Sequence, residues 1–289
     1  MILNIMLSGN RKPKEIILKC LICGSPMQFY FSKEYDSFDL GKVEYYRCDC
    51  CGFTLSKTHT EMSDHSWKRL NHQYHSSYHG QETCPDDPKW IKRLNTQSMV
   101  ISDLTKLGLL ESKGRWLDFA CGDGKLSDTL KENHDLNLLK YDKYMQKTIG
   151  FITDEALVKR SFDFVITTSV FEHFTRREDF DFVESLVSIN GVLGLHTLVC
   201  EDVPQDPSWF YLLPVHCAFH TNRSMSLLFK QWGYSASIYN VEAQLWLWFK
   251  TDPEKIQSTI LKANLRENRP KYFYKPDFVD YWKVIPYRQ

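Results

Sequence analysis

The residues best suited to chemistry are two aspartates that each close an apolar run. Asp118 lies near the end of the run RWLDFA, and Asp142 ends the run LNLLKYD about twenty residues later. Gly122 and Gly124 follow Asp118, where a strand would turn into a helix and a ligand could approach bare backbone. A carboxylate after the second strand is well placed for ribose hydroxyls. Together these residues predict a nucleoside site at the carboxyl edge of a parallel sheet.

The loop does not fit a nucleotide phosphate. A P-loop would need glycine where Phe119 stands and Ser or Thr where Leu126 stands. A dinucleotide loop, G-x-G-x-x-G, would need a glycine where Ala120 stands, and Asp118 would put negative charge beside a pyrophosphate. A cationic nucleoside cofactor that carries no phosphate tolerates this carboxylate.

Four cysteines near the start of the chain have the spacing of a metal site. Two C-x-x-C pairs, each followed by glycine, are formed by Cys20 with Cys23 and by Cys48 with Cys51. Zinc takes four such ligands in a tetrahedron, and a shell of four thiolates leaves no position for a reactive water. The pattern therefore predicts a structural zinc ion, with Cys50 as a spare thiol that could exchange for Cys48.

The segments around these cysteines read as a zinc ribbon followed by a connector. MQFYF and KVEYYRC alternate apolar and polar residues on either side of a turn, which predicts two short strands. The connector holds His75 and His79 at a spacing that could hold a metal on one helix face. No acid completes that set, so we favour an aromatic-rich connector that folds over a pocket.

From Pro88 onward, strands and helices alternate. Strands are predicted at 115–120, 136–142, 150–153, 162–168, 191–199, 234–240 and 243–249; helices are predicted at 88–111, after Gly124, at 177–189 and at 222–233. Apolar strands separated by amphipathic helices indicate a parallel sheet covered on both faces. The predicted division is 1–62 for the zinc ribbon, 63–87 for the connector, 88–250 for the core and 251–289 for a C-terminal extension.

In this core the chain resembles the class I S-adenosylmethionine-dependent methyltransferases over about residues 90 to 250. LDFACGDG keeps the acid and two glycines of their first motif, with Ala120 for the first glycine; KYDKY supplies the acid after the second strand. FDFVITTSVFEHF matches their fourth-strand motif, with Asp163, Ser169, Glu172 and His173. INGV replaces their usual Pro-Gly-Gly turn.

The resemblance implies a Rossmann-like, doubly wound, seven-stranded and mostly parallel sheet that binds S-adenosylmethionine. Asp118 and the loop backbone would hold the methionine end, Asp142 the ribose, and Asp154 with Glu155 the adenine edge. The cofactor set is thus Asp118, Ala120, Gly122, Gly124, Asp142, Asp154 and Ser169. Glu172 and His173 could either cap the next segment or touch ligand.

The catalytic candidates follow the fifth strand of this core. The segment EDVPQDPSWFYLLPVHCAFHTNRSM is rich in proline and aromatic residues, as expected of a substrate wall. A proton acceptor is needed for an oxygen or carbon nucleophile. We name His216 first, Tyr211 second and His173 third. The alternative is that His220 caps the following helix and Trp209 only packs.

The composition limits the class of acceptor and the compartment. Lys plus Arg and Asp plus Glu both number 36, so no strong field gathers phosphate backbones. No apolar run is long enough for a signal peptide or a membrane span, which predicts a cytoplasmic enzyme. Zinc ribbon, tyrosine-rich connector and core together are similar to bacterial methyltransferases of sugar and polysaccharide biosynthesis. The alternatives are an RNA methyltransferase and a non-catalytic scaffold whose ribbon binds a protein partner.

Overall fold

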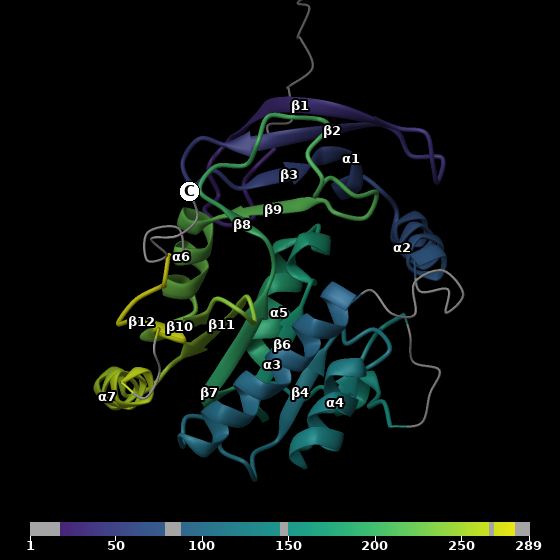
Figure 1. Cartoon of the computed structure of the whole chain (residues 1–289). Helices are drawn as coiled ribbons and strands as arrows, with labels where there is room; N and C mark the ends of the chain where they lie inside the picture. Colours follow the sequence, from purple (N-terminus) through teal and green to yellow (C-terminus); the bar gives the residue numbers. More distant parts are fainter. Residues whose placement is uncertain (1–17, 79–87, 145–149, 266–268, 281–289) are drawn as a thin grey trace, which may run out of the picture.

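The computed structural model describes residues 18–78, 88–144, 150–265 and 269–280. Two sheets carry the fold, a smaller one stacked beyond one end of a larger one (Figure 1). Residues 281–289 of the predicted extension and residues 79–87 of the predicted connector lie outside the described residues, and with them His79 of the less favoured metal pair.

The larger sheet has seven strands in the order β12-β10-β11-β7-β6-β4-β5. Their bounds are β4 Trp116–Phe119, β5 Leu139–Tyr141, β6 Phe162–Thr168, β7 Val187–His196, β10 Ala236–Asn240, β11 Leu245–Phe249 and β12 Tyr272–Lys275. The pairs β4·β5, β4·β6 and β6·β7 are parallel, whereas β7·β11, β10·β11 and β10·β12 are antiparallel. An α/β fold is confirmed, but the sheet is mixed, because a short turn between β10 and β11 forces them antiparallel.

The seventh strand is not the one that the sequence predicts. Residues 150–153 contribute only a single bridge, between Phe151 and Lys140, at the β5 edge. The seventh place is taken at the opposite edge by β12, which belongs to the predicted C-terminal extension. Strand 162–168 is confirmed as β6, with Phe162–Thr168 as its bounds.

Helices cover both faces of this sheet. They are α3 Pro88–Lys106, α4 Lys125–His134, α5 Arg177–Leu186, α6 Asn222–Gln231 and α7 Pro253–Asn264. Along β6, Val165 packs into one apolar core with α5 and α6, and its neighbours Phe164 and Ile166 pack into another with α3, α4 and α7. Alternate residues of the strand thus serve opposite faces. The predicted helix at 177–189 is shorter in the structure because β7 begins directly at Val187.

The smaller sheet joins segments that are far apart in the sequence. Its order is β1-β2-β3-β9-β8, with β1 Met27–Tyr35, β2 Gly41–Cys48, β3 Thr54–Ser56, β9 Ala218–Thr221 and β8 Val199–Cys200. Thr54 pairs with Phe219 and Leu55 with Ala218, so β3, which follows the second cysteine pair, is hydrogen-bonded to β9 in the segment that follows β7. This pairing holds residues 199–221 beyond the end of the larger sheet (Figure 1).

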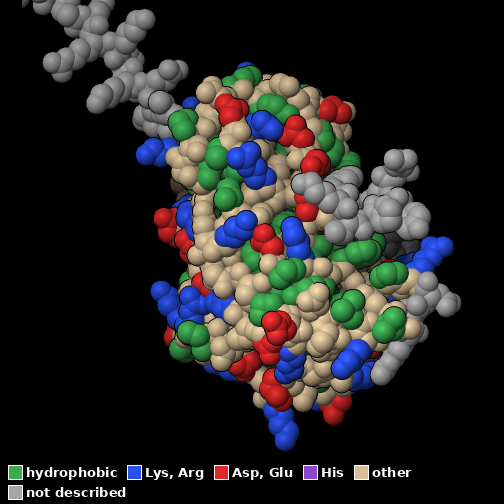
Figure 2. Space-filling view, turned by 90° about the vertical axis from the view of Figure 1, so that its left-hand side faces the viewer, with side chains coloured by type: hydrophobic (Ala, Val, Ile, Leu, Met, Phe, Trp, Pro, Cys, Tyr) green, Lys and Arg blue, Asp and Glu red, His purple; other side chains and the backbone are tan. Residues whose placement is uncertain are grey.

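Two further helices follow β3. α1 spans Lys57–Thr60, and α2 spans Asp64–Tyr78, so the described part of the connector is helical. Within the described residues, no helix is both long and apolar enough to cross a membrane. In the face drawn in Figure 2, acidic and basic side chains are interspersed and no single charge dominates.

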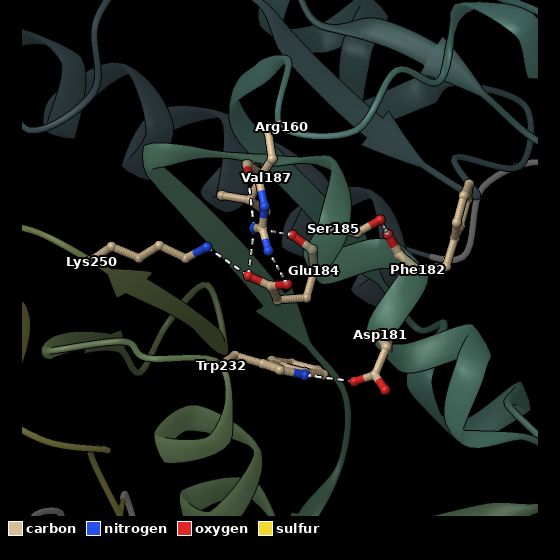
Figure 3. A network of polar contacts seen from close by, with 8 residues as sticks. All are labelled: Arg160, Asp181, Phe182, Glu184, Ser185, Val187, Trp232 and Lys250. Atoms are coloured by element: carbon tan, nitrogen blue, oxygen red, sulfur yellow. Dashed lines mark hydrogen bonds and ion pairs between the residues drawn. The ribbon is translucent and has the colours of Figure 1, made fainter.

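An ion network ties α5 to its neighbours around the sheet. Glu184 on α5 accepts from Arg160 Nη1 at 2.7 Å and from Lys250 Nζ at 2.6 Å (Figure 3). The Glu184 side chain is 8% exposed and that of Lys250 is 12% exposed. Trp232 Nε1 donates to Asp181, one turn earlier on the same helix, at 2.8 Å. These contacts connect α5 to the segments before β6, after α6 and after β11.

Candidate active site

A cavity of about 990 Å³ lies where the parallel strands end and is bounded on one side by α2. Nine of the residues predicted from the sequence line it: Asp118, Ala120, Gly122, Asp142, Asp154, Ser169, His173, Tyr211 and His216. They come from the ends of β4, β5 and β6, from short 3-10 helices at Asp154–Ala156 and Phe171–His173, and from the segment between β8 and β9. The structure therefore brings the predicted cofactor side and the predicted catalytic side to one cavity.

Gly124 is not among the lining residues, although it belongs to the same loop. It starts α4 with a φ of +79°, a conformation that L side chains rarely adopt. A Cβ there would lie 2.5 Å from Cδ of Lys140. Gly122, by contrast, has a φ of +59° and nothing within 4 Å of a built Cβ. Gly122 leaves the loop open beside the cavity, while Gly124 allows the helix to begin close behind it.

The carboxyl group of Asp118 is buried, with the residue 1% exposed. One oxygen accepts from Ser127 Oγ at 3.2 Å, and the other, Oδ1, is buried with no hydrogen-bond partner. Burial raises the pKa of Asp118 to about 7, with smaller contributions from the charges of Asp142 and Asp123. A positive charge placed in the cavity beside Asp118 would offset this desolvation and favour the ionised carboxylate.

Asp142 is held by the backbone around it. Its Oδ2 accepts from Gly122 N–H at 3.0 Å and its Oδ1 from Tyr144 N–H at 2.8 Å. The first bond ties the end of β5 to the glycine loop after β4. A carboxylate has about four lone-pair sites, so it can accept from a ligand hydroxyl as well as from backbone N–H groups.

The remaining two cofactor candidates also lie on constrained segments. Asp154 accepts from the hydroxyl of Tyr141 at 2.8 Å, which fixes its carboxylate at the cavity edge. Ser169 has a φ of +58°, which is uncommon for a residue with a side chain, and its N–H donates to His196 O at 2.8 Å. This strained turn follows β6 directly and directs the chain toward Glu172.

The opposite wall carries a buried carboxylate beside two histidines. Glu172 is 1% exposed; its Oε1 accepts from Tyr211 Oη at 2.6 Å and its Oε2 from Thr197 Oγ1 at 2.9 Å. The rings of His173 and His216 lie edge to face, with centroids 5.0 Å apart. We call Glu172, His173, Tyr211 and His216 the acceptor-side cluster.

The hydrogen bonds of His216 define its tautomer. Nδ1 lies 2.9 Å from the carbonyl oxygen of Tyr211. A carbonyl only accepts, so Nδ1 carries the proton of the neutral ring and Nε2 keeps its lone pair. Burial lowers the pKa of both His216 and His173, so both rings are neutral near pH 7.

Tyr211 differs from the histidines because its proton is already engaged. Burial, and then the adjacent Glu172 carboxylate, raise the pKa of Tyr211 well above its ordinary value. Its hydroxyl therefore remains protonated and donates to Glu172. Tyr211 could act as a base only after Glu172 had accepted its proton.

The neighbours of this cluster have structural contacts. His220 lies in β9, fully buried, with its ring 5.1 Å from that of Phe53. Thr221 rather than His220 caps α6, because Thr221 Oγ1 accepts from Ser224 N–H at 3.1 Å. Trp209 packs against Phe219, with ring centroids 5.2 Å apart.

Several residues at the cavity were missed from the sequence. Arg93 of α3 lies with Nη1 3.0 Å from His196 Nε2, while His196 Nδ1 bonds the carbonyl of Gln244 at 2.8 Å, so His196 accepts from the guanidinium. By contrast, α2 lies in the connector that the sequence predicts to fold over a pocket, and its Trp67, Tyr74 and His75 do line the cavity; Asn71 beside them was not singled out. The sequence held a signal for Glu172, in FEH after β6, but none for Arg93 or Thr197, whose partners are distant in sequence.

The four predicted zinc ligands come together beside the start of β1 and the end of β2, and three of them, Cys20, Cys48 and Cys51, are buried in the same apolar core as α5 and α6. Their sulfurs all lie within 4.8 Å of one another, with Cys20–Cys51 at 3.5 Å and Cys23–Cys48 at 3.4 Å. Ligands of a tetrahedral zinc at about 2.3 Å would lie about 3.8 Å apart, so this cluster fits the ion. The adjacent Cys51 thiol lowers the pKa of Cys20 to about 6, toward the thiolate that binds metal. Cys50 is outside the cluster.

Comparison with known proteins decides the class of this site. The profile of the methyltransferase domain family matches residues 92–236, which is half of the chain. The chain belongs to the methyltransferase domain family. It is a methyltransferase that depends on S-adenosylmethionine. A search of curated proteins finds no match.

Three solved structures illustrate the similarity of fold. A SAM-dependent methyltransferase of Archaeoglobus fulgidus is 14% identical, over 50% of this chain and 72% of its own, with a TM-score of 0.36. Magnesium protoporphyrin IX methyltransferase of Synechocystis PCC 6803 is 18% identical, over 64% and 100%, with a TM-score of 0.42. A chain from the complex of the Haloferax volcanii Trm112 methyltransferase activator with a methyltransferase is 12% identical, over 61% and 96%, with a TM-score of 0.44. Because the sequence identities and TM-scores are this low, these structures indicate nothing about the acceptor of this methyltransferase.

Proposed function

We propose that this methyltransferase transfers a methyl group from S-adenosylmethionine to a small-molecule acceptor, a sugar, nucleotide-sugar or surface-glycan precursor. The observation that carries the proposal is the single cavity shared by Asp118, Asp142 and the acceptor-side cluster. When bound, S-adenosylmethionine supplies a methyl carbon activated by its sulfonium. The residues of the chain then have to bind the cofactor, align the acceptor and accept its proton.

The cofactor would lie along the ends of β4, β5 and β6. Asp118, with its unpartnered Oδ1, suits the cationic methionine end, together with the backbone at Ala120, Gly122 and Gly124. Asp142 suits the ribose hydroxyls, because two N–H groups hold its carboxylate at the cavity and a carboxylate accepts readily from hydroxyls. Asp154 is proposed for the adenine edge, and Ser169 for the turn beneath the cofactor.

The acceptor would lie between the cofactor and α2. We assign proton removal to His216, whose Nε2 keeps its lone pair because the proton is held on Nδ1. His173 and Tyr211 support this role from the same cluster, Tyr211 as a hydrogen-bond donor to Glu172. A positioned base of this kind contributes about 10² to 10⁴-fold to the rate.

The wall opposite the glycine loop suits a sugar. Trp67, Tyr74 and Trp90 line the cavity with flat apolar faces, among polar groups such as Asn71. The chain carries 36 Lys plus Arg against 36 Asp plus Glu, whereas RNA binding would favour a basic excess.

A structural zinc is part of the same proposal. Bound at Cys20, Cys23, Cys48 and Cys51, it would form a zinc ribbon that anchors the smaller sheet. Through the pairing of β3 with β9, the ribbon would also anchor the segment bearing Tyr211 and His216. The division into ribbon, connector, core and extension, and a cytoplasmic location, accompany this assignment.

The proposal is tested by calorimetry with S-adenosylhomocysteine on the full chain. The wild-type protein should bind one equivalent, and Asp142→Ala should bind at least about tenfold more weakly because two ribose hydroxyls lose a charged acceptor. Asp135→Asn, at the exposed end of α4 and outside the cavity, is the matched control and should bind like wild type. No binding by the wild-type protein would refute the function, and unchanged affinity of Asp142→Ala would refute the ribose assignment.

The acceptor class is tested separately with radiolabelled S-adenosylmethionine. Label should enter nucleotide-sugars or glycan precursors and not an equal mass of bulk RNA. Labelling of RNA alone would overturn the sugar assignment and favour the nucleic-acid alternative.

A further inference from the structure

We propose that Glu172, His173 and His216 hold a divalent first-row transition-metal ion on the acceptor side of the cavity, distinct from the four-cysteine site. One ligand atom of each residue lies within 4.8 Å of the others. Two imidazoles and one carboxylate can occupy one face of the coordination shell, which leaves the other coordination positions of the ion open. All three residues line the cavity, so those open positions are accessible to an acceptor.

Burial of an unneutralised carboxylate is the first argument for an ion. Glu172 is 1% exposed, and within the described residues no Lys or Arg forms a salt bridge with it. Both of its oxygens accept hydrogen bonds from hydroxyls, as expected of an ionised group. Buried charges are normally paired or coordinate a metal.

The histidines supply lone pairs directed by their other contacts. His216 donates from Nδ1 to the Tyr211 carbonyl, which is the arrangement usual for a metal-bound histidine and leaves Nε2 as the ligand atom. His173 Nδ1 is buried and has no hydrogen-bond partner, which is costly unless something binds it. Tyr211 and Thr197 similarly fix the carboxylate of Glu172.

The geometry requires only small adjustments. Ligand atoms about 2.1 Å from one ion lie about 3 to 3.4 Å apart, so each side chain has to move by less than about 1 Å. The thiolates of the four-cysteine site select zinc, whereas a carboxylate with imidazoles also accepts Mn²⁺. This difference in ligand softness allows the two sites to be distinguished.

An ion here would define the acceptor class more closely. An acceptor with neighbouring oxygens, such as the vicinal hydroxyls of a sugar, could occupy two open positions of the ion. In that case His216 and His173 would act as ligands, and His216 would not be the base; the ion would lower the pKa of the coordinated hydroxyl, and its proton would pass to solvent. This part of the inference rests on the proposed function; the existence of the site does not.

The test is equilibrium dialysis of the zinc-loaded full chain against Mn²⁺ alone. The wild-type protein should bind one Mn²⁺ per chain, and His216→Gln and His173→Asn should each bind at least about tenfold more weakly. The control is His65→Gln, an exposed histidine on α2 outside the cavity, which should bind as wild type does.

Calorimetry with S-adenosylhomocysteine on the same samples separates the two proposals. Wild-type protein that binds the cofactor product but no Mn²⁺ overturns the metal site and leaves the proposed function intact. Variants that retain product binding while losing Mn²⁺ are folded and support the site, whereas variants that retain Mn²⁺ binding refute it. For a variant that loses product binding, an anomalous-scattering map of wild-type crystals soaked in Mn²⁺ decides: a peak between Glu172 and His216 is the expected result, and its absence refutes the site.

Discussion

Because of the buried carboxyl group of Asp118, we expect the cofactor to bind more tightly as pH rises. Burial raises the pKa of its carboxyl group to about 7 in the unliganded protein. Placing a cation beside it would favour the ionised form, so binding would release a proton and tighten as pH rises. With a free-protein pKa of about 7, the dissociation constant of S-adenosylmethionine should be about eightfold larger at pH 6 than at pH 7.5.

The assay is isothermal titration calorimetry at several pH values, in buffers of different ionisation enthalpy. The buffer dependence of the heat gives the number of protons released, which should approach one per cofactor near pH 6. Burial lowers the pKa of both His173 and His216, and any proton that they exchange on binding would persist in Asp118→Asn. Asp118→Asn is the matched control; it retains the shape of the side chain and should bind weakly, without the pH dependence.

Two results would refute this reasoning. Dissociation constants that agree within about twofold between the two pH values would show that the carboxyl does not change its charge on binding. An equal pH dependence in Asp118→Asn would assign the proton to another group.

Three further predictions concern stability and the zinc site. Gly52→Ala should lower the free energy of unfolding by about 1 to 3 kcal/mol more than Gly24→Ala does. Both glycines have a positive φ, but only at Gly52 would a new Cβ clash, at 2.8 Å from Cγ2 of Thr221. Equal losses in urea unfolding would contradict this. Cys23→Ser should reduce the zinc content from about one ion per chain to none and lower Tm, as measured by elemental analysis and thermal scans. The control Cys50→Ser should keep its zinc, and full zinc content in Cys23→Ser would exclude the four-cysteine site. Glu184→Gln should lower the free energy of unfolding by about 2 to 4 kcal/mol, since Lys250 would remain buried without its anion. Glu178→Gln, at an exposed position of the same helix, should lower it by less than about 0.5 kcal/mol. Similar urea midpoints for the two variants would show that the network does not stabilise the fold.

The strands and helices were largely predictable because their signals are local. The apolar run at 162–168 and the amphipathic pattern at 222–233 each correspond to an observed element, within a few residues at the ends. The departures have tertiary causes. Residues 150–153 form only a bridge, while the seventh strand, β12, pairs with β10 more than thirty residues away in sequence. The hydrophobic pattern of a strand does not indicate which distant strand it will pair with.

The candidate site divides in the same way. Asp118, Gly122 and Asp142 were found from the sequence because each stands at or just beyond the end of a strand, and parallel strands end at one edge. Glu172 and Tyr211 meet at 2.6 Å although 39 residues separate them, and Arg93 meets His196 across 103 residues. Sequence spacing does not predict contacts between side chains that are this far apart along the chain.

By itself, the sequence determined the apolar periods of the core, the acids and glycines at its strand ends, and four cysteines in two equivalent pairs. Only the tertiary structure decided that β3, which follows the second cysteine pair, shares a sheet with β9, and that the segment before β9 and α2 enclose the cavity beside the glycine loop. It also made Gly24 and Gly52 unequal, because only one of them packs against a distant side chain. The reason is that periodicity and backbone preference act between neighbours in sequence, whereas burial, desolvation and side-chain contact depend on which distant segments the folded chain brings together.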